Sequence, residues 1–197
     1  MSVSLVDHGG ANIGSVLHAL QRLGVEAILT TEATVIRRAD HVILPGVGAA
    51  RPAMARLREI GLVDVLRSLS QPVLGICLGM QLLCTHSDEG DVDCLGVIDA
   101  RVRRFDETTR LPIPHRGWNQ VEASCPAHRL CSGAAGHGWA YFVHSYEVPV
   151  CSSTVAVCRY GSHFSAAIAR DNFMGVQFHP ERSSAFGQAV LRNFLSA

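Results

Sequence analysis

One cysteine stands where an expected strand gives way to an expected helix. The run 73-VLGICLGMQLL-83 begins with apolar residues, continues with a helical pattern, and places Cys77 between Gly75 and Gly79. A tight strand-to-helix turn of the G-x-nucleophile-x-G kind presents its central side chain outward on a strained backbone. The amino end of the helix favours the thiolate over the thiol. Cys77 is therefore a candidate nucleophile, and the competing interpretation is a buried core cysteine in a glycine-rich turn.

A thiolate nucleophile needs a base and a group that orients the base. The run 175-GVQFHPER-182 places His179 after an apolar strand pattern and Glu181 two residues later. This spacing lets the carboxylate accept a hydrogen bond from the imidazole and fix its tautomer. His144, in 141-YFVHSYEV-148, is a competing base that spacing alone does not exclude.

Backbone N–H groups near the expected nucleophile can stabilise an oxyanion. The N–H of Leu78 follows Cys77 directly. In 43-ILPGVG-48, Gly46 and Gly48 flank Val47 after an expected strand, so a peptide there can supply a second donor. The alternative for this run is an ordinary turn that ends a strand.

The composition excludes several classes of chemistry. All 17 basic residues of the 197-residue chain are Arg, which removes a P-loop lysine and a Schiff-base lysine. The segment 9-GGANIG-14 has glycine spacing like that of a P-loop, but Ser15 follows where lysine is required. Basic and acidic residues balance at 17 each, which gives no reason to expect binding to nucleic acid or to a membrane surface.

The cysteines and the amino terminus indicate a reducing compartment. Seven cysteines show neither CxxC pairs nor the Cys/His spacing of zinc sites, so we expect no metal and no cofactor. The first residues, MSVSLVDHGG, lack the pattern of a signal peptide, and apolar runs are interrupted well short of the ~18 residues of a membrane span. We expect a cytoplasmic protein.

Short apolar runs alternate with helical patterns in the first half of the chain, and short strands with turn signals follow Gly96. The expected strands are 4–7, 25–29, 41–44, 73–76, 97–105, 119–122, 139–143, 154–160, 166–169 and 173–178. The expected helices are 12–23, 31–38, 52–69 with a break near Gly61, 78 to about 86, and 184–195.

This order of elements predicts an α/β fold. Repeated strand, helix, strand units are typical of an open, mostly parallel or mixed sheet with helices on both faces. The sequence contains no linker, repeat or low-complexity segment, so we expect residues 1–197 to form a single domain.

Five motifs carry a family resemblance. The runs LPGVGA, GICLGMQLL, PHRGWNQV, YFVHSY and GVQFHPERS occur in this order over nearly the whole chain. As a set they resemble the class I (triad) glutamine amidotransferases, whose architecture is flavodoxin-like. PGVG and P-H-x-G-W-N resemble the glutaminase subunits of imidazole glycerol phosphate synthase rather than the glutaminases of GMP, anthranilate or carbamoyl phosphate synthesis.

The resemblance implies a function for each motif. A triad of Cys77, His179 and Glu181 hydrolyses the side-chain amide of glutamine to glutamate and ammonia. Residues Gly46, Val47, Gly48 and Leu78 form the oxyanion hole. The amino-acid end of glutamine is held by Gln81, Glu89, His144, Ser145 and Tyr146, so that His144 becomes a binding residue.

The resemblance also implies a partner, because the family passes its ammonia to a synthetase. For this group the partner is a separate (β/α)8-barrel cyclase, bound as a heterodimer, that receives ammonia through an internal tunnel. The cyclase produces imidazole glycerol phosphate and aminoimidazole carboxamide ribotide in histidine biosynthesis. Asn12, Trp118 and Arg182 match positions that face the cyclase, and the loaded partner is expected to reshape the PGVG loop of a nearly idle glutaminase.

Four positions depart from the usual pattern: His8, Ala50, Arg116 and Arg182. They leave the triad untouched, and three of them lie on or near the expected partner face. The nearest alternative function is therefore a paralogous glutaminase that feeds a different synthetase, such as one of surface-sugar biosynthesis. Further alternatives are a cysteine hydrolase that acts alone and an inactive regulatory module.

Overall fold

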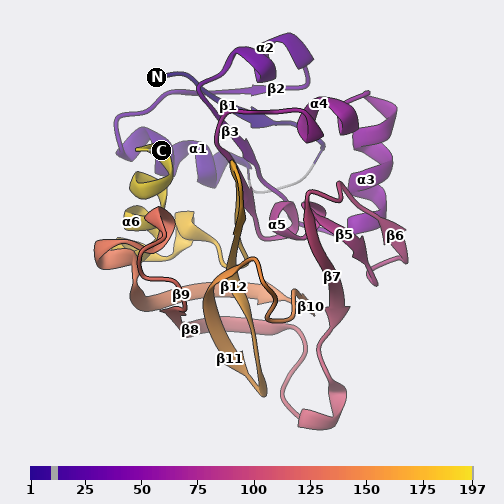
Figure 1. Cartoon of the computed structure of the whole chain (residues 1–197), viewed down its shortest axis with the longest axis vertical. Helices are drawn as coiled ribbons and strands as arrows, with labels where there is room; N and C mark the ends of the chain where they lie inside the picture. Colours follow the sequence, from indigo (N-terminus) through magenta and orange to yellow (C-terminus); the bar gives the residue numbers. More distant parts are fainter. Residues whose placement is uncertain (10–12, 197) are drawn as a thin grey trace.

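The computed structural model describes residues 1–9 and 13–196, and its main element is a nine-stranded mixed sheet (Figure 1). Five neighbouring strands are parallel, and the other four continue the sheet in antiparallel pairs. The spatial order is β2 (Ala27–Thr30), β1 (Val3–Val6), β3 (His41–Leu44), β4 (Val73–Ile76), β13 (Phe173–Val176), β12 (Ser162–Arg170), β11 (Thr154–Tyr160), β8 (His115–Ala123) and β9 (His137–His144).

Helices cover both faces of this sheet because its central strands are apolar on both sides. Side chains alternate along a strand: Ile43 packs in one core cluster, whereas Val42 and Leu44 pack in the other. The first cluster includes α1 (Ile13–Arg22) and α6 (Ser184–Leu195). The second includes α2 (Ala33–Arg38), α3 (Ala50–Glu59), α4 (Val63–Arg67) and α5 (Leu78–Leu82).

A second sheet, of four strands, shows that one predicted helix is too long. The helix expected from residue 78 to about 86 ends at Leu82, and Cys84–Ser87 forms strand β5. The sheet has the order β10 (Tyr146–Glu147), β7 (Ile98–Arg104), β5 and β6 (Val92–Asp93). Strand β5 pairs in parallel with β7, so tertiary pairing overrides the local helical pattern after Leu83.

The other elements follow the expected order. Strands β3, β4 and β11 and helix α6 have the expected bounds, and the break near Gly61 separates α3 from α4. Strands β8, β9 and β12 are longer than expected, because antiparallel pairing extends each of them past its apolar centre. Short 3-10 turns are η1 (Glu107–Thr109), η2 (Arg129–Cys131), η3 (Gly133–Ala135) and η4 (Pro180–Arg182).

The parallel strands bring the chemical residues to one edge of the sheet. Strands β1, β3, β4 and β13 are consecutive neighbours with the same direction, so their carboxyl ends lie side by side. The residues that follow these ends include His8, Gly46, Cys77 and His179. Ligand sites of open α/β sheets lie at this edge.

Candidate active site

Cys77 occupies a strained turn between β4 and α5. Its backbone has φ 53° and ψ −110°, and its N–H donates to the Val176 carbonyl of the neighbouring strand at 2.8 Å. The flanking glycines are required by space: a Cβ on Gly75 would lie 2.6 Å from the backbone of Gly79, and a Cβ on Gly79 would lie 1.8 Å from the Leu44 oxygen. Strain at a non-glycine residue persists only where the surroundings hold it, and here it presents a thiol.

His179 and Glu181 stand beside this turn. The chain leaves β13 at Val176, and the His179 N–H donates to the Tyr141 carbonyl of β9 at 2.9 Å, which fixes the backbone at His179. The His179 Nδ1 lies 2.9 Å from Glu181 Oε1, and the two side chains are 6% and 1% exposed. A carboxylate only accepts, so Nδ1 carries the proton of this bond.

The protonation of His179 follows from its two polar partners. Burial alone would lower the pKa of His179, but hydrogen bonds to the Cys77 sulfur and to the Glu181 carboxylate outweigh it and raise the pKa to about 10. Since Nδ1 faces Glu181, the Nε2 side of the ring faces the sulfur. At neutral pH the arrangement therefore favours the imidazolium form of His179, placed beside the Cys77 sulfur.

His144, the competing base, belongs to a different chain of hydrogen bonds. Its Nδ1 donates to the Tyr146 carbonyl at 2.8 Å, and its Nε2 lies 3.1 Å from His115 Nδ1. Since a carbonyl cannot donate, His144 accepts from His115, which in turn accepts from the Asn119 amide at 3.3 Å. Burial lowers the pKa of His144 to about 3 and of His115 to about 4. His144 is neutral, and both its nitrogens are engaged.

Gln177 is a neighbour of the sulfur that sequence reasoning missed. This fully buried side chain directs its Nε2 toward Cys77 Sγ at 3.7 Å, while its Oε1 accepts from Gln81 Nε2 at 2.9 Å. Gln81 also donates to the Tyr146 carbonyl at 3.0 Å, so both amides have one orientation. A signal was present in the sequence, because residues 177 and 179 share a face of an extended chain.

A cavity of about 280 Å³ opens onto the sulfur and collects the predicted binding residues. Its walls include both Cys77 and His179, and Val143 of β9. The predicted glutamine-binding residues all line it: Gln81, Glu89, His144, Ser145 and Tyr146. The predicted oxyanion residues Val47, Gly48 and Leu78 line it as well, as does Arg182. A cavity of this size with several polar groups suits a small polar ligand.

The predicted oxyanion donor is engaged in this structure. The Leu78 N–H donates to the Gly46 carbonyl at 3.3 Å. Gly46 fits closely against α5, because an added Cβ would lie 2.9 Å from the Leu78 Cβ. Rotation of the Gly46–Val47 peptide would remove this carbonyl, free the Leu78 N–H and turn the Val47 N–H toward the same point. In the observed conformation the Leu78 N–H is therefore not available to another acceptor.

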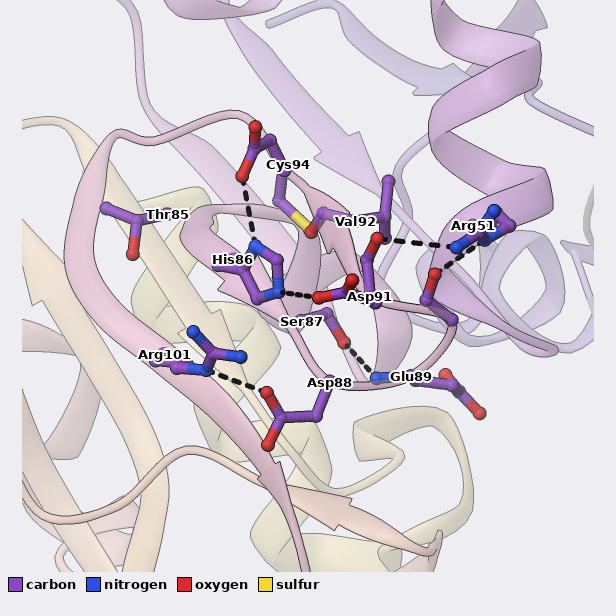
Figure 2. A network of polar contacts seen from close by, with 12 residues as sticks. Arg51, Thr85, His86, Ser87, Asp88, Glu89, Asp91, Val92, Cys94 and Arg101 are labelled. Atoms are coloured by element: carbon purple, nitrogen blue, oxygen red, sulfur yellow. Dashed lines mark hydrogen bonds and ion pairs between the residues drawn. The ribbon is translucent and has the colours of Figure 1, made fainter.

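Glu89 reaches the cavity from the loop between β5 and β6, which polar contacts hold in place (Figure 2). Its carboxylate accepts from the Ala50 N–H at the start of α3, at 3.1 Å, and burial raises its pKa. Arg51 of α3 donates to the Gly90 carbonyl. Behind the loop, His86 lies 3.0 Å from carboxylate oxygens of both Asp91 and Asp93. Only the backbone of Ala50 is used, so the departure there leaves this contact intact.

The structure describes two of the three predicted partner positions, Trp118 and Arg182. Trp118 is 50% exposed on β8, and Arg116 shares its face. Trp118 pairs in register with Tyr141 of β9, and the Arg182 guanidinium lies 4.5 Å from the Tyr141 ring centroid. Asn12 lies outside the described residues.

Three further observations concern the helices, the metal-ligating residue types and the other cysteines. Among residues 1–9 and 13–196, no helix is long and apolar enough to cross a membrane. Within the same residues, no group of three or more His, Cys, Asp or Glu side chains is arranged to hold a metal ion. Burial raises the pKa of the Cys94, Cys131 and Cys158 thiols to about 12, 11 and 12, and that of Cys84 further.

Known proteins share both the sequence and the fold of this chain. It is 50% identical over 196 residues to "Imidazole glycerol phosphate synthase subunit HisH" of Pectobacterium atrosepticum, which covers 99% of each chain. It is 51% identical over 193 residues to the protein of the same name from Xanthomonas axonopodis pv. citri, covering 98% of this chain and 96% of the relative.

Solved structures support the fold. A glutamine amidotransferase structure superimposes with a TM-score of 0.75 at 20% identity, covering 98% of this chain and 97% of that one. A glutamine amidotransferase from Thermotoga maritima gives 0.71 at 15% identity, with 100% and 96% covered. The family model "Glutamine amidotransferase class-I" matches residues 4–197, and the chain belongs to this family.

Proposed function

We propose that this chain hydrolyses the side-chain amide of glutamine and passes the ammonia to a separate (β/α)8-barrel cyclase that makes imidazole glycerol phosphate. One observation supports the glutaminase chemistry: Cys77 and His179 line the same cavity, and Glu181 accepts a hydrogen bond from His179 that orients its ring. The names of the relatives that match over nearly their whole length support the partner and the pathway.

The residues of the cavity divide the reaction between them. The Cys77 thiolate adds to the amide carbon of glutamine, and the carbonyl oxygen becomes an oxyanion. The imidazolium of His179 gives its Nε2 proton to the leaving nitrogen, so ammonia departs and a thioester remains. Neutral His179 then takes a proton from water, which attacks the thioester and releases glutamate and the thiolate. Glu181 holds the same His179 tautomer throughout.

Glu89 and the segment 144–146 suit the amino-acid end of glutamine. The Glu89 carboxylate lines the cavity and can pair with an ammonium group. The His115–His144 pair fixes the Tyr146 carbonyl and, through it, the shape of this wall. Because both imidazoles are neutral, they add no charge beside the substrate.

The closed oxyanion site supports a glutaminase whose activity is low until the cyclase binds. With the Gly46 carbonyl on the Leu78 N–H, an oxyanion at Cys77 would meet a carbonyl oxygen instead of a donor. Partner binding that favours the rotated peptide would raise the rate through a shift in populations. The Trp118 face is continuous with the cavity through Arg182 and Val143, and we assign it to the cyclase.

The test compares glutamate formation by the pure chain alone, with the cyclase, and with the cyclase loaded with its nucleotide substrate. We expect a slow rate alone and the highest rate with the loaded cyclase. The Cys77→Ala variant of the complex should lose glutamine-dependent turnover and keep turnover with ammonium salts. Loss of both would mean that Cys77 is needed for assembly. Equal activity without any partner would refute the cyclase assignment.

A further inference from the structure

His8 is a buried histidine beside the oxyanion loop that the proposed chemistry does not use. It follows strand β1 and is 5% exposed. Its Nε2 is hydrogen-bonded to the carbonyl oxygen of Pro45. Because a carbonyl only accepts, Nε2 carries the proton and donates. The sequence already marks His8 as a departure from the usual pattern.

The contact joins two neighbouring parallel strands at their carboxyl ends. Strand β1 pairs with β3, with Leu5 opposite Ile43, so the residues that leave both strands lie side by side. Pro45 is the first residue after β3, and its carbonyl belongs to the peptide that ends at Gly46. His8 therefore binds the peptide immediately before the one whose carbonyl closes the oxyanion site.

Two consecutive carbonyls are thus held in the closed arrangement. His8 binds the Pro45 oxygen, and the Leu78 N–H binds the Gly46 oxygen. Rotation of the Gly46–Val47 peptide requires new backbone angles at Gly46, which is packed tightly against Leu78. The rotation changes ψ of Gly46 and φ of Val47, and in this packed site it also requires a small shift of Gly46 away from Leu78. That shift displaces the Pro45–Gly46 peptide, and the bond to His8 resists the displacement.

Two cavities border the loop at Val47 and leave room for it to move. Val47 lines the 280 Å³ cavity and also a second hollow of about 140 Å³, whose wall includes His8 and Pro52. Val47 is half-buried and Gly48 is exposed, with φ 106°. Because Val47 borders both cavities, side-chain packing holds the loop only weakly. Backbone hydrogen bonds therefore contribute much of the stability of its conformation.

We infer that His8 is a positioning residue that holds the oxyanion loop closed and so sets the idle rate of the glutaminase. This inference rests on the proposed function. A net hydrogen bond contributes about 1 kcal/mol, which corresponds to roughly a fivefold change in a conformational equilibrium. Loss of the donor should raise the open population, and the partner-free rate, by about fivefold.

The experiment compares His8→Leu, which removes the donor, with His8→Gln, whose amide can reach a similar position. His18→Leu, at an exposed position on α1, is the matched control. We expect His8→Leu to increase partner-free glutamate formation about fivefold and to leave the rate with the loaded cyclase within twofold. His8→Gln should return the partner-free rate to near the unsubstituted value, and the control should match the unsubstituted chain.

A second measurement separates this inference from the proposed function. Hydrogen exchange at the Leu78 amide reports opening of its bond to Gly46 without any catalysis. His8→Leu should exchange about five times faster there, with exchange in the core strands unchanged. An unchanged Leu78 exchange rate, or a partner-free rate that falls, would overturn the role of His8. Faster exchange in a chain without glutaminase activity would instead leave the loop contact supported and refute the proposed function.

Discussion

The bond between Glu181 and His179 gives a sharp prediction for Glu181→Gln. The neutral amide removes a charge-assisted bond of 2.9 Å between side chains that are almost fully buried. Such bonds contribute about 1.5–3 kcal/mol, so the loss alone lowers kcat about 10- to 100-fold. If the new amide turns its NH₂ group toward His179, Nδ1 becomes the acceptor and the neutral imidazole carries its proton on Nε2. Nε2 can then no longer accept a proton from water.

We therefore expect kcat for glutamine to fall at least 100-fold, with KM changed less than about threefold. The sign of the pH effect follows from the same bond. Glu181 is one of the groups that raise the pKa of His179, so its removal lowers that pKa, and the imidazolium is lost at a lower pH. The alkaline limb of the glutamine-dependent rate should move to lower pH in the variant.

The assay measures glutamate formation across pH in the complex, alongside turnover with ammonium salts, which reports intact assembly. Glu26→Gln is the matched control, because Glu26 is exposed before β2, at the opposite edge of the sheet. A fall in kcat of less than tenfold, with ammonia-dependent turnover intact, would show that Glu181 does not orient the base.

Three further outcomes are expected. A glutamine-mimicking electrophile should label Cys77 ahead of the buried thiols, whose pKa values are raised; peptide mass spectra showing even labelling would contradict a single activated nucleophile. Gly79→Ala should destabilise the fold by more than about 3 kcal/mol, because its Cβ would meet a carbonyl oxygen at 1.8 Å, whereas Gly14→Ala, at an exposed helical position with open space, should gain up to about 1 kcal/mol; denaturant unfolding measures both, and equal stabilities would refute the steric argument. Trp118→Ala should weaken binding of the cyclase at least 30-fold in a titration, while Ile28→Ala, which trims an exposed apolar residue on β2, should not; equal effects would remove Trp118 from the interface.

The sequence predicts the parallel half of the fold well because its strands are buried on both faces. The apolar runs 41–44 and 73–76 have the bounds of β3 and β4, since an uninterrupted apolar run ends where the strand leaves the core. The prediction fails after Leu83, where Cys84–Ser87 continues the helical pattern and yet pairs with β7. The local sequence of that segment does not indicate that it pairs with a strand that begins at Ile98.

The sequence predicts those residues of the candidate site that directly follow a recognisable strand. Cys77 and His179 each follow a strand, and parallel neighbours place both at one edge. The contacts of Gln177 and His8 depend on which strands are adjacent and on how side chains orient across them. Strand order is a tertiary property, so the sequence can mark these residues but only the structure shows their contacts.

The choice between His144 and His179 shows why residue type and spacing were insufficient. Both histidines are buried near the sulfur's cavity, and burial disfavours the charge on each. Their polar partners make the difference: the Cys77 sulfur and the Glu181 carboxylate offset burial at His179, whereas a carbonyl and a second imidazole do not offset it at His144. Burial lowers the pKa of His144 to about 3, and its polar partners do not offset that effect. The pKa of about 10 for His179 depends on the Cys77 sulfur, from another segment of the chain, and on Glu181, two residues further along its own. A candidate base is therefore distinguished by the groups that face its two nitrogens: the sequence spacing predicts Glu181, whereas the order of the strands places the Cys77 sulfur.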